Sequence, residues 1–331
     1  MQNHLLSGPP LVVVLGTGGT IAGTSARSGD DIGYTAGQIG AAQMVAALPA
    51  LTGQPIEVEQ IAQIDSKDMS VAVWRALALA VARHLARPEV GGIVITHGTD
   101  TLEETAYFLQ RLLAPAKPVV LVAAMRPSTS LQADGPQNLL DAFTVARQLD
   151  ASGVVSVLAG RVHSALDLRK RHTYRLDAFG SGDAGAVAEV ESGRLRLHRG
   201  WPSSAAIGVE RLPAEGAAWP WVEVVTSHAD ARRHAVDALR VAGVDGIVVA
   251  GTGNGSIHVS LEAALVEARA AGVAVLRCTR CLGGSVIDAA ADGEGETAIG
   301  AHETALVSAG SLTPFQARVE LMLRLLAARA G

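Results

Sequence analysis

The stretch Leu11–Gly23, LVVVLGTGGTIAG, decides the fold of this 331-residue chain. It opens with an unbroken apolar run, Leu11–Leu15, which is typical of a strand buried on both faces of a parallel sheet. The run then breaks into glycines and two threonines, Thr17 and Thr20. Glycine allows left-handed backbone angles and a close approach to a ligand. Ligands of open α/β sheets bind beyond the carboxyl ends of the strands, so we expect this turn to carry the functional site.

The glycine turn does not fit the common nucleotide-binding motifs. A dinucleotide fingerprint that starts at Gly16 would need glycine at position 21, where the chain has Ile21. A phosphate-binding P-loop would need Gly-Lys-Ser/Thr, and the turn contains no lysine. A purely structural role for the turn is still an alternative at this point. The sharper hypothesis is that a threonine hydroxyl acts as a nucleophile, which requires a base from elsewhere because a free hydroxyl is weak.

Composition narrows the class of protein. The chain is long enough for two domains, and 49% of its residues are hydrophobic. No apolar run reaches the ~18 residues that a membrane helix needs, and the first residues lack the basic segment of a signal peptide. A formal net charge of −5 gives no general attraction for nucleic acid or anionic membranes. We therefore expect a cytoplasmic protein, or a periplasmic one if a leader has been removed.

Strand-like runs alternate with helical patterns, which predicts an α/β fold with a mostly parallel, doubly wound sheet. Between residues 191 and 220 the pattern loosens into short runs with proline and glycine, which indicates a hairpin and a linker. We therefore predict a larger N-terminal domain over residues 1–190 and a smaller C-terminal α/β domain over residues 221–331. The expected strands are Leu11–Leu15, Ile56–Ile64, Gly92–Thr96, Pro118–Ala123, Gly153–Leu158, Trp221–Val225, Gly246–Ala250 and Val273–Cys278.

Two of the expected helices begin with a capping signal. Thr101 and Glu104 predict a capping box that opens a helix to about Leu113. Thr313 and Gln316 predict a second box, with a proline at the first position of the final helix.

Polar clusters follow several of the expected strands. His97–Thr101 (HGTDT) places a second threonine and a carboxylate at a helix start, where backbone amides favour developing negative charge. By itself, Asp100 fits equally well as a first-turn acid of that helix. Asp65–Asp68 (DSKD) fits either a solvated loop or the polar end of a pocket for a small zwitterion. Pro127–Thr129 (PST) is most simply a structural turn.

Together these motifs resemble those of a known family. Thr17–Gly23 (TGGTIAG), Ile95–Thr101 (ITHGTDT) and Ala124–Ser130 (AMRPSTS) are similar to sequences of the bacterial type II L-asparaginases, which are threonine amidohydrolases of the asparaginase/glutaminase family. Shorter matches at 65–69, 251–255 and 310–314 extend the resemblance over nearly the whole chain. It implies hydrolysis of L-asparagine to L-aspartate and ammonia through an acyl–threonine intermediate, without a cofactor or a metal.

The resemblance also implies the catalytic residues. Thr17 matches the nucleophile, and Tyr34 matches the tyrosine on a mobile loop that closes over the substrate and activates the nucleophile. Thr99, Asp100 and Lys170 match the second threonine with its supporting aspartate and lysine. A free tyrosine hydroxyl is protonated at neutral pH, so Tyr34 needs a nearby positive charge or a proton relay, and Lys170 is the natural candidate. Without the resemblance, Lys170 would be assigned to a solvated basic run.

The same resemblance implies the substrate-binding residues. Ser66 and Asp100 match the groups that hold the α-carboxylate and α-ammonium of the substrate, and the Ala124 carbonyl matches a contact to its amide. Asn254 matches a residue contributed by a neighbouring subunit of a homotetramer, a dimer of dimers with sites at a subunit interface. Lys67 stands where the family usually has glutamine, beside the substrate ammonium. It either points outward or alters affinity and substrate preference.

Further positions depart from the family pattern. A neighbouring-subunit acid is expected among Asp288, Asp292, Glu294 and Glu296, without a single assignment. Cys278 and Cys281 form one C-x-x-C sequence without the second pair that a metal site would need, so we expect no metal or redox role.

Two alternative functions stay open. A mixed glutaminase–asparaginase would use the same motifs, because one extra methylene changes binding in a pocket by only ~1–3 kcal/mol. A non-catalytic sensor of amino acids would be favoured by loss of Thr17, Tyr34, Thr99 or Lys170, and the sequence retains all four.

Overall fold

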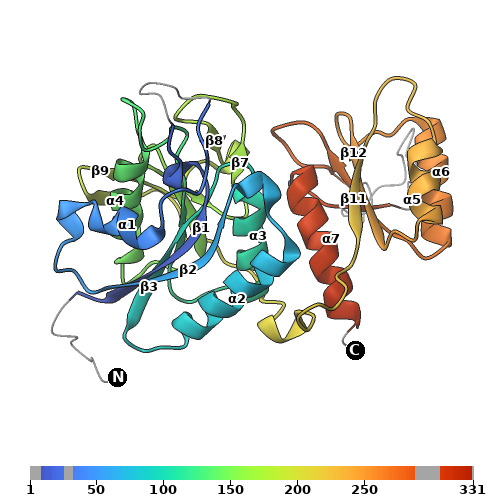
Figure 1. Cartoon of the computed structure of the whole chain (residues 1–331). Coiled ribbons are helices and arrows are strands. Elements are labelled where there is room, and N and C mark those ends of the chain that lie inside the picture. The colour runs from blue at the N-terminus through green and yellow to red at the C-terminus, as the bar shows by residue number, and fades with distance from the viewer. Residues whose placement is uncertain (1–8, 26–32, 288–305, 330–331) are drawn as a thin grey trace. The chain divides into compact units, whose positions relative to one another are not determined.

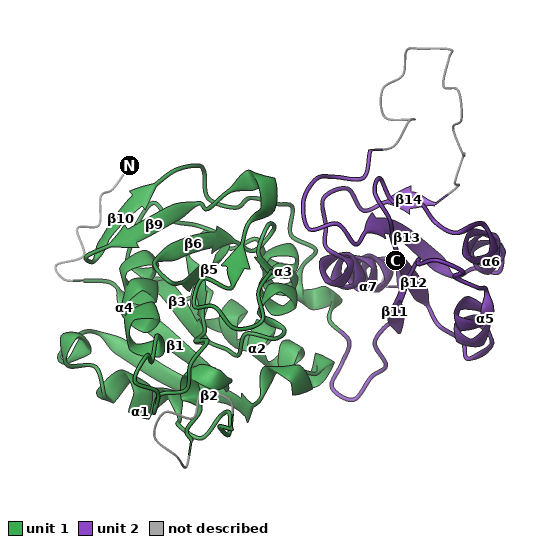
Figure 2. Cartoon of the chain, turned by 90° about the horizontal axis from the view of Figure 1, so that it is seen from above, with its two compact units in different colours: residues 1–212 green, residues 213–331 purple. Residues whose placement is uncertain are grey.

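The computed structural model describes residues 9–25, 33–287 and 306–329. The chain divides into two compact units, Met1–Leu212 and Pro213–Gly331 (Figure 2). Each unit is a mostly or wholly parallel sheet covered by helices, which confirms the predicted fold class. Within the described residues, no helix is both long enough and apolar enough to cross a membrane.

The first unit contains a sheet of eight strands and a separate two-stranded ribbon, β7 (Arg169–Lys170) with β8 (Phe179–Gly180). The strands of the large sheet are β1 (Leu11–Gly18), β2 (Ile56–Ile64), β3 (Val90–Thr96), β4 (Val119–Val122), β5 (Val154–Leu158), β6 (Arg161–Ser164), β9 (Ala188–Glu191) and β10 (Arg194–Leu197). Their order is β10-β9-β6-β5-β4-β3-β1-β2. Strands β1 to β5 run parallel, whereas β6, β9 and β10 pair antiparallel.

Helices cover both faces of this sheet (Figure 1). One face carries α1 (Ala41–Ala46) and α4 (Gly135–Ala146), and the other carries α2 (Val71–Leu85) and α3 (Leu102–Leu113). All four residues of Val12–Leu15 are fully buried, because β1 lies inside the sheet between two helical layers. This explains the unbroken apolar run from which the fold was predicted.

The order of the strands creates a switch point beside β1. The chain passes from β1 to β2 on one side, and it then returns to β3 on the other side of β1. Gly16 pairs with Thr96 of β3, and Gly18 pairs with Ile64 of β2. The carboxyl ends of three adjacent strands therefore meet, at the place where open α/β sheets bind ligands.

The second unit is a four-stranded parallel sheet. Its order is β11 (Val222–Thr226), β12 (Gly246–Gly251), β13 (Ala274–Thr279) and β14 (Val307–Ser308). Helices α5 (His234–Val241) and α6 (Val259–Ala270) cover one face, and α7 (Pro314–Arg329) covers the other (Figure 1).

The start of α7 has the capping box that the sequence predicts. The Gln316 backbone amide donates to Thr313 Oγ1 at 3.1 Å, and the Thr313 amide donates to Gln316 Oε1 at 3.1 Å. Two amides at the helix start are thus satisfied reciprocally, and the box is confirmed.

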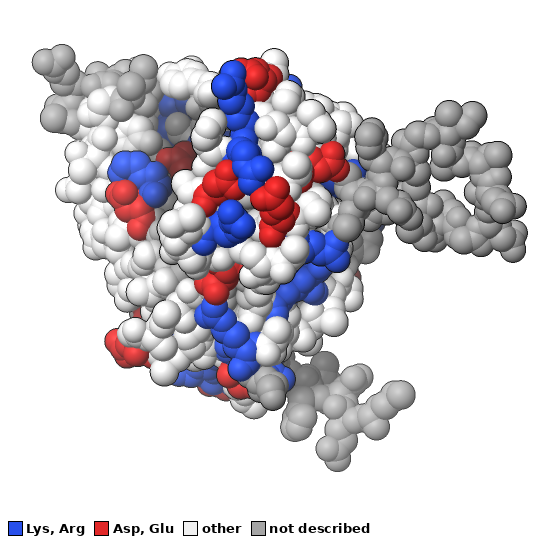
Figure 3. Space-filling view, turned by 90° about the vertical axis from the view of Figure 1, so that its right-hand side faces the viewer, with Lys and Arg blue, Asp and Glu red and all other residues white. Residues whose placement is uncertain are grey.

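Basic and acidic groups intermingle on the face shown in Figure 3. In the second unit, for example, Arg233 pairs with Asp237 at 2.7 Å and with Glu267 at 2.6 Å. This face presents mixed charge, not the stripe of one sign that a nucleic-acid interface would need.

Candidate active site

Three turns at the switch point pack against one another through glycine. A Cβ added at Gly19 would lie 2.3 Å from the Gly98 nitrogen, and one added at Gly98 would lie 2.4 Å from Ser66 Oγ. Gly19 also has a φ of +84°, which side chains rarely adopt. The turns that follow β1, β3 and β2 are therefore held in contact by atoms that only glycine leaves uncovered. This contact brings Thr17, Ser66 and the Thr99 turn to one place.

Replacing Gly19 by alanine should destabilise the protein severely. The new methyl group combines left-handed strain of ~1–2 kcal/mol with overpacking of ~1–3 kcal/mol, so we expect a loss of about 2–5 kcal/mol in the free energy of unfolding. Denaturant melts of the purified variant measure this loss. Gly53→Ala is the matched control, because Gly53 has a φ of +74° but no heavy atom within 4 Å of the added Cβ. Equal losses in both variants would show that turn packing contributes nothing.

The hydroxyls of Thr17, at the end of β1, and of Thr20, in the turn that follows, have different partners. Thr17 is 2% exposed, and its hydroxyl donates to the Thr96 carbonyl at 2.8 Å. The Tyr34 hydroxyl lies 2.7 Å from Thr20 Oγ1. Among the described residues, Tyr34 therefore contacts Thr20 and not Thr17. The resemblance implies a role for Tyr34 at Thr17. Residues 26–32 of the expected mobile loop Gly23–Gly37 lie outside the described residues.

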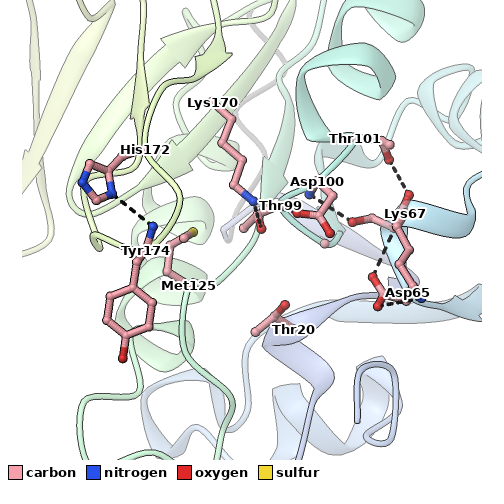
Figure 4. A network of polar contacts seen from close by, with 12 residues as sticks. Thr20, Asp65, Lys67, Thr99, Asp100, Thr101, Met125, Lys170, His172 and Tyr174 are labelled. Carbon is pink, nitrogen blue, oxygen red and sulfur yellow. Dashed lines mark hydrogen bonds and ion pairs between the residues drawn. The ribbon is translucent and has the colours of Figure 1, made fainter. Parts of the chain in front are cut away.

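Lys170 brings a positive charge to Thr99 (Figure 4). Its ammonium donates to Thr99 Oγ1 at 2.9 Å and to Asp100 Oδ1 at 2.7 Å. Its backbone amide donates to Glu103 Oε2 at 2.6 Å, which fastens β7 to the start of α3. Glu103 is buried, as is the neighbouring Arg169. Lys170 is thus a fixed member of this cluster and does not belong to a solvated basic face.

Ser66 joins the β2 turn to the β3 turn. Its side chain is buried, and Ser66 Oγ accepts a hydrogen bond from the Asp100 backbone amide at 3.1 Å. The Thr101 hydroxyl donates to the Ser66 carbonyl at 2.8 Å. The capping box predicted at Thr101 is therefore wrong: α3 begins at Leu102, but the hydroxyl bonds to a neighbouring turn and makes no cap. A carbonyl brought close by the fold has replaced the local partner.

Lys67 points away from the threonines (Figure 4). Its side chain is 61% exposed, and its ammonium lies 2.9 Å from Asp68 Oδ2 and 3.1 Å from Asp65 Oδ2. Hydrogen bonds to Asp68 and Asp65 raise the pKa of Lys67, so it stays charged at neutral pH. Of the two orientations that the sequence left open, the structure has the outward one.

If the substrate is L-asparagine, as the resemblance implies, replacing Lys67 by glutamine should change KM by less than about fivefold, since exposed ion pairs contribute only ~0–1 kcal/mol. Initial rates of ammonia release over a range of substrate concentrations give this value. Ser66→Ala is the matched neighbour, and we expect its KM to rise at least about tenfold, because a buried polar contact is lost. A tenfold change in KM for Lys67→Gln would place its ammonium beside the substrate.

The Ala124 turn is fixed by an acid on the residue that precedes α4. The amides of Met125 and Arg126 each donate to Asp134 Oδ1, at 3.1 and 3.0 Å, and the Met125 amide also donates to Asp134 Oδ2 at 3.0 Å. The Asn138 side chain donates to the Ala123 carbonyl at 2.9 Å. The peptide groups on both sides of Ala124 are therefore held. The orientation of the Ala124 carbonyl follows from these contacts.

The predicted turn Pro127–Thr129 fastens the strand-end turns to one another. Ser128 donates to the Gly23 carbonyl through its amide at 3.0 Å and its hydroxyl at 2.8 Å. Thr129 Oγ1 accepts from the Ser25 amide at 3.0 Å. A structural role accounts for both hydroxyls of this segment.

Four residues that support the site were not assigned to it from the sequence. His97 is fully buried; its Nδ1 donates to the Gly98 carbonyl at 2.7 Å, and burial lowers the pKa of the ring to about 4, so it is neutral at pH 7. Thr20, Glu103 and Asp134 have the contacts described above. All four lie within or beside the matched motifs. Most of their partners lie in other segments of the chain, and the spacing of the motifs does not predict these contacts.

The remaining predicted residues belong to the second unit. Asn254 is exposed in the turn after β12, where it donates to the Ile287 carbonyl at 3.1 Å and accepts from the Ile287 amide at 2.8 Å. The acids Asp288, Asp292, Glu294 and Glu296 lie outside the described residues.

The cysteines and potential metal ligands add no second centre in the described part of the chain. Cys278 and Cys281 are free thiols, and burial raises the pKa of Cys278 to about 12. Across residues 9–25, 33–287 and 306–329, no three His, Cys, Asp or Glu side chains gather as metal ligands would.

Each of the two units matches a family of known proteins. Residues 11–203 match the model of the asparaginase N-terminal domain, and residues 221–329 match that of the glutaminase/asparaginase C-terminal domain. The chain therefore belongs to the asparaginase family, which confirms the resemblance found in the sequence.

Individual relatives match over most of the chain. L-asparaginase 2 of Escherichia coli (strain K12) is 38% identical over 323 residues, which cover 96% of this chain and 89% of that protein. Glutaminase-asparaginase of Pseudomonas fluorescens biotype A is 36% identical over 83% of this chain and 77% of its own length. The crystal structure of a probable cytoplasmic L-asparaginase from Campylobacter jejuni superposes with a TM-score of 0.86 at 37% identity, covering 96% of this chain and 95% of that one.

Proposed function

We propose that this enzyme hydrolyses L-asparagine to L-aspartate and ammonia through a covalent threonine ester. The observation that carries the proposal is the contact of the Lys170 ammonium with Thr99 and Asp100, beside the turn of Thr17 at the switch point of the sheet. The family and the similarity to L-asparaginases supply the substrate class.

Thr17 is the nucleophile of the proposal. Its Oγ1 attacks the side-chain amide carbon, and the C–N bond breaks. The hydroxyl proton of Thr17 is passed to the leaving nitrogen, so that ammonia departs and an acyl ester remains on Thr17. Water then attacks the ester, returns a proton to Thr17 and frees L-aspartate. Splitting the reaction in this way replaces one difficult step by two easier ones. Tyr34 activates Thr17 in this proposal, and its hydroxyl is held in the same segment by the 2.7 Å contact with Thr20 Oγ1.

The Thr99–Lys170–Asp100 group assists proton transfer and stabilises the negative charge that develops in the reaction. A positive ammonium 2.9 Å from Thr99 Oγ1 makes that hydroxyl a better acid and stabilises negative charge that develops near it. Asp100 holds the ammonium in place at 2.7 Å. The two residues therefore position Thr99 for proton transfer to or from the reacting groups.

Substrate binding is assigned to polar groups around the threonines. Ser66 and Asp100 hold the α-carboxylate and the α-ammonium, and the Ala124 carbonyl accepts from the substrate amide. The fixed peptide groups around Ala124 support this role, because orientation and not only affinity is needed for catalysis. The exposed carboxylate of Asp100 has room for a second cation beside Lys170.

Ammonia release from the purified chain tests the proposal. L-asparagine, L-glutamine and D-asparagine are compared at millimolar and micromolar concentrations. Turnover of L-asparagine well above that of L-glutamine is expected. Comparable L-glutamine turnover would support the mixed enzyme, which the similarity to the Pseudomonas fluorescens protein favours as the second candidate. A folded protein that binds these amino acids without releasing ammonia would be a sensor and would overturn the proposal.

We further propose a homotetramer, a dimer of dimers, in which Asn254 completes the site of a neighbouring subunit. Support comes from its exposed position in the second unit and from the family resemblance. Sedimentation equilibrium should give four times the mass of one chain. For the compartment we propose the cytoplasm, since the similar Campylobacter jejuni protein is described as probably cytoplasmic. Cell fractionation with a periplasmic marker tests this assignment.

A further inference from the structure

A cavity of about 450 Å³ lies in the first unit, and none of its lining residues belongs to the site described above. Its walls come from strands β6, β8 and β9 and from the residues that follow β7, β8 and β10. Its volume is typical of small-molecule sites. The polar residues on its walls that matter here are Arg161, His163, Arg171, Ser181, Glu189 and Arg199.

The charges on these walls do not balance. Three arginines line the cavity against a single glutamate. Arg199 is paired with Asp167 at 2.6 Å, and Glu189 is paired with Arg196 at 2.5 Å. Arg161 lies at 4.0 Å from Glu189. Among the residues that the structure describes, no carboxylate lies within 4.0 Å of the Arg171 guanidinium, which packs over Gly180.

A buried polar pair lies on the same wall. His163 is 3% exposed and Ser181 is 5% exposed, and His163 Nδ1 lies 2.8 Å from Ser181 Oγ. Burial first, and then the charges of Arg161, Arg171 and Arg199, lower the pKa of His163 to about 4. The ring is therefore neutral at pH 7, and the positive charges of three guanidinium groups are concentrated around it. A positive potential in a partly enclosed space attracts anions.

We propose that this cavity binds a small multivalent oxyanion, such as a phosphate ester or a polycarboxylate. Arginine guanidinium groups bind both kinds of oxyanion with charge-assisted hydrogen bonds, often in bidentate geometry. Arg171 and Arg161 supply the charge, and the Ser181 hydroxyl supplies a buried polar contact.

The ribbon couples this cavity to the proposed active site. Arg171 follows Lys170 directly, and successive side chains of an extended segment point to opposite sides. Lys170 reaches Thr99, whereas Arg171 faces the cavity. Lys170 pairs with Phe179, and the Arg171 amide donates to the Ala178 carbonyl at 2.8 Å. An anion bound to Arg171 and Ser181 therefore engages the residues that directly follow both strands of the ribbon, one of which carries Lys170.

Isothermal titration of the full-length protein with pyrophosphate and with citrate tests the binding. We expect saturable binding of at least one anion at sub-millimolar concentration, and at least tenfold weaker binding by Arg171→Gln and by Arg161→Gln. Arg194→Gln, which changes the same charge on β10 outside the cavity lining, should bind like the wild type. Preference for pyrophosphate or for citrate identifies the phosphate or the carboxylate class. Absence of binding by the wild type, or equal binding by all three variants, would overturn the proposal.

The coupling rests on the proposed function and has its own test. Ammonia release from L-asparagine is measured with and without the bound anion, at constant ionic strength. We expect kcat to change at least twofold in the wild type and not in Arg171→Gln. Unchanged kinetics at saturation would overturn the coupling, and titration without substrate shows separately whether the anion binds. A chain that binds the anion but releases no ammonia from any amide would indicate failure of the proposed function instead.

Discussion

Replacing Thr17 by alanine should lower kcat for L-asparagine by at least about 10⁴-fold, the scale seen when a hydroxyl nucleophile is removed from a hydrolase. The loss is large because, in the proposal, Thr17 Oγ1 is the atom that forms the covalent ester. Thr17 is almost fully buried, and its hydroxyl makes one hydrogen bond to the Thr96 carbonyl. Removing that bond costs about 1 kcal/mol of stability. The variant should therefore fold, and its unfolding curve should stay close to that of the wild type.

Controls separate the nucleophile from its neighbours. Thr17→Ser keeps a hydroxyl at the same place and should retain measurable turnover. Thr52→Ala removes an exposed threonine far along the chain and should have wild-type kinetics. Because the Tyr34 hydroxyl contacts Thr20, Thr20→Ala is the decisive comparison. An inactive Thr20→Ala together with an active Thr17→Ala would move the nucleophile to Thr20.

Replacing Lys170 by methionine should lower kcat by about 10²–10⁴-fold, the range for loss of a positioned acid–base group. Methionine keeps much of the length of the side chain but removes the ammonium that Thr99 and Asp100 contact. Steady-state kinetics should show this loss mainly in kcat, and the backbone bond from residue 170 to Glu103 should keep the ribbon in place.

Lys67→Met is the matched control for this second prediction. It removes an ammonium from an exposed lysine whose partners are Asp65 and Asp68, so kcat should stay within about twofold of wild type. Thr99→Val and Lys170→Met should together cost much less than the sum of their separate effects, because contacting residues act as a unit. Additive losses would show that the Lys170–Thr99 contact has no catalytic role.

The fold was predictable because its signals are local. The apolar run of β1 reflects burial on both faces, and the glycines that follow it, Gly16, Gly18 and Gly19, reflect contacts that leave no space for a side chain. The capping box at Thr313 formed as predicted, since both partners lie within one helical turn. The apolar run and the capping box depend on residues that are neighbours in the sequence. The glycines are visible in the sequence, but the contacts that require them come from distant segments, as between Gly19 and Gly98.

The contacts of the site were less predictable because they join distant segments. Thr101 has the same capping signal as Thr313, but the fold places the Ser66 carbonyl within reach of its hydroxyl. The sequence did not settle the direction of the Lys67 side chain, which the structure shows paired with Asp65 and Asp68. Lys170 lies in a basic run that gives no sign of its contact with Thr99, 71 residues earlier.

The glycine contacts between the three turns have a consequence for engineering this enzyme. The turn after Thr17 meets the Thr99 turn through main-chain atoms of Gly19 and Gly98, and the Ser66 side chain packs directly on Gly98. Libraries that vary these glycines would therefore yield mainly misfolded chains. A new substrate range would have to come from the side chains that border the substrate, with the spacing of the three turns inherited unchanged.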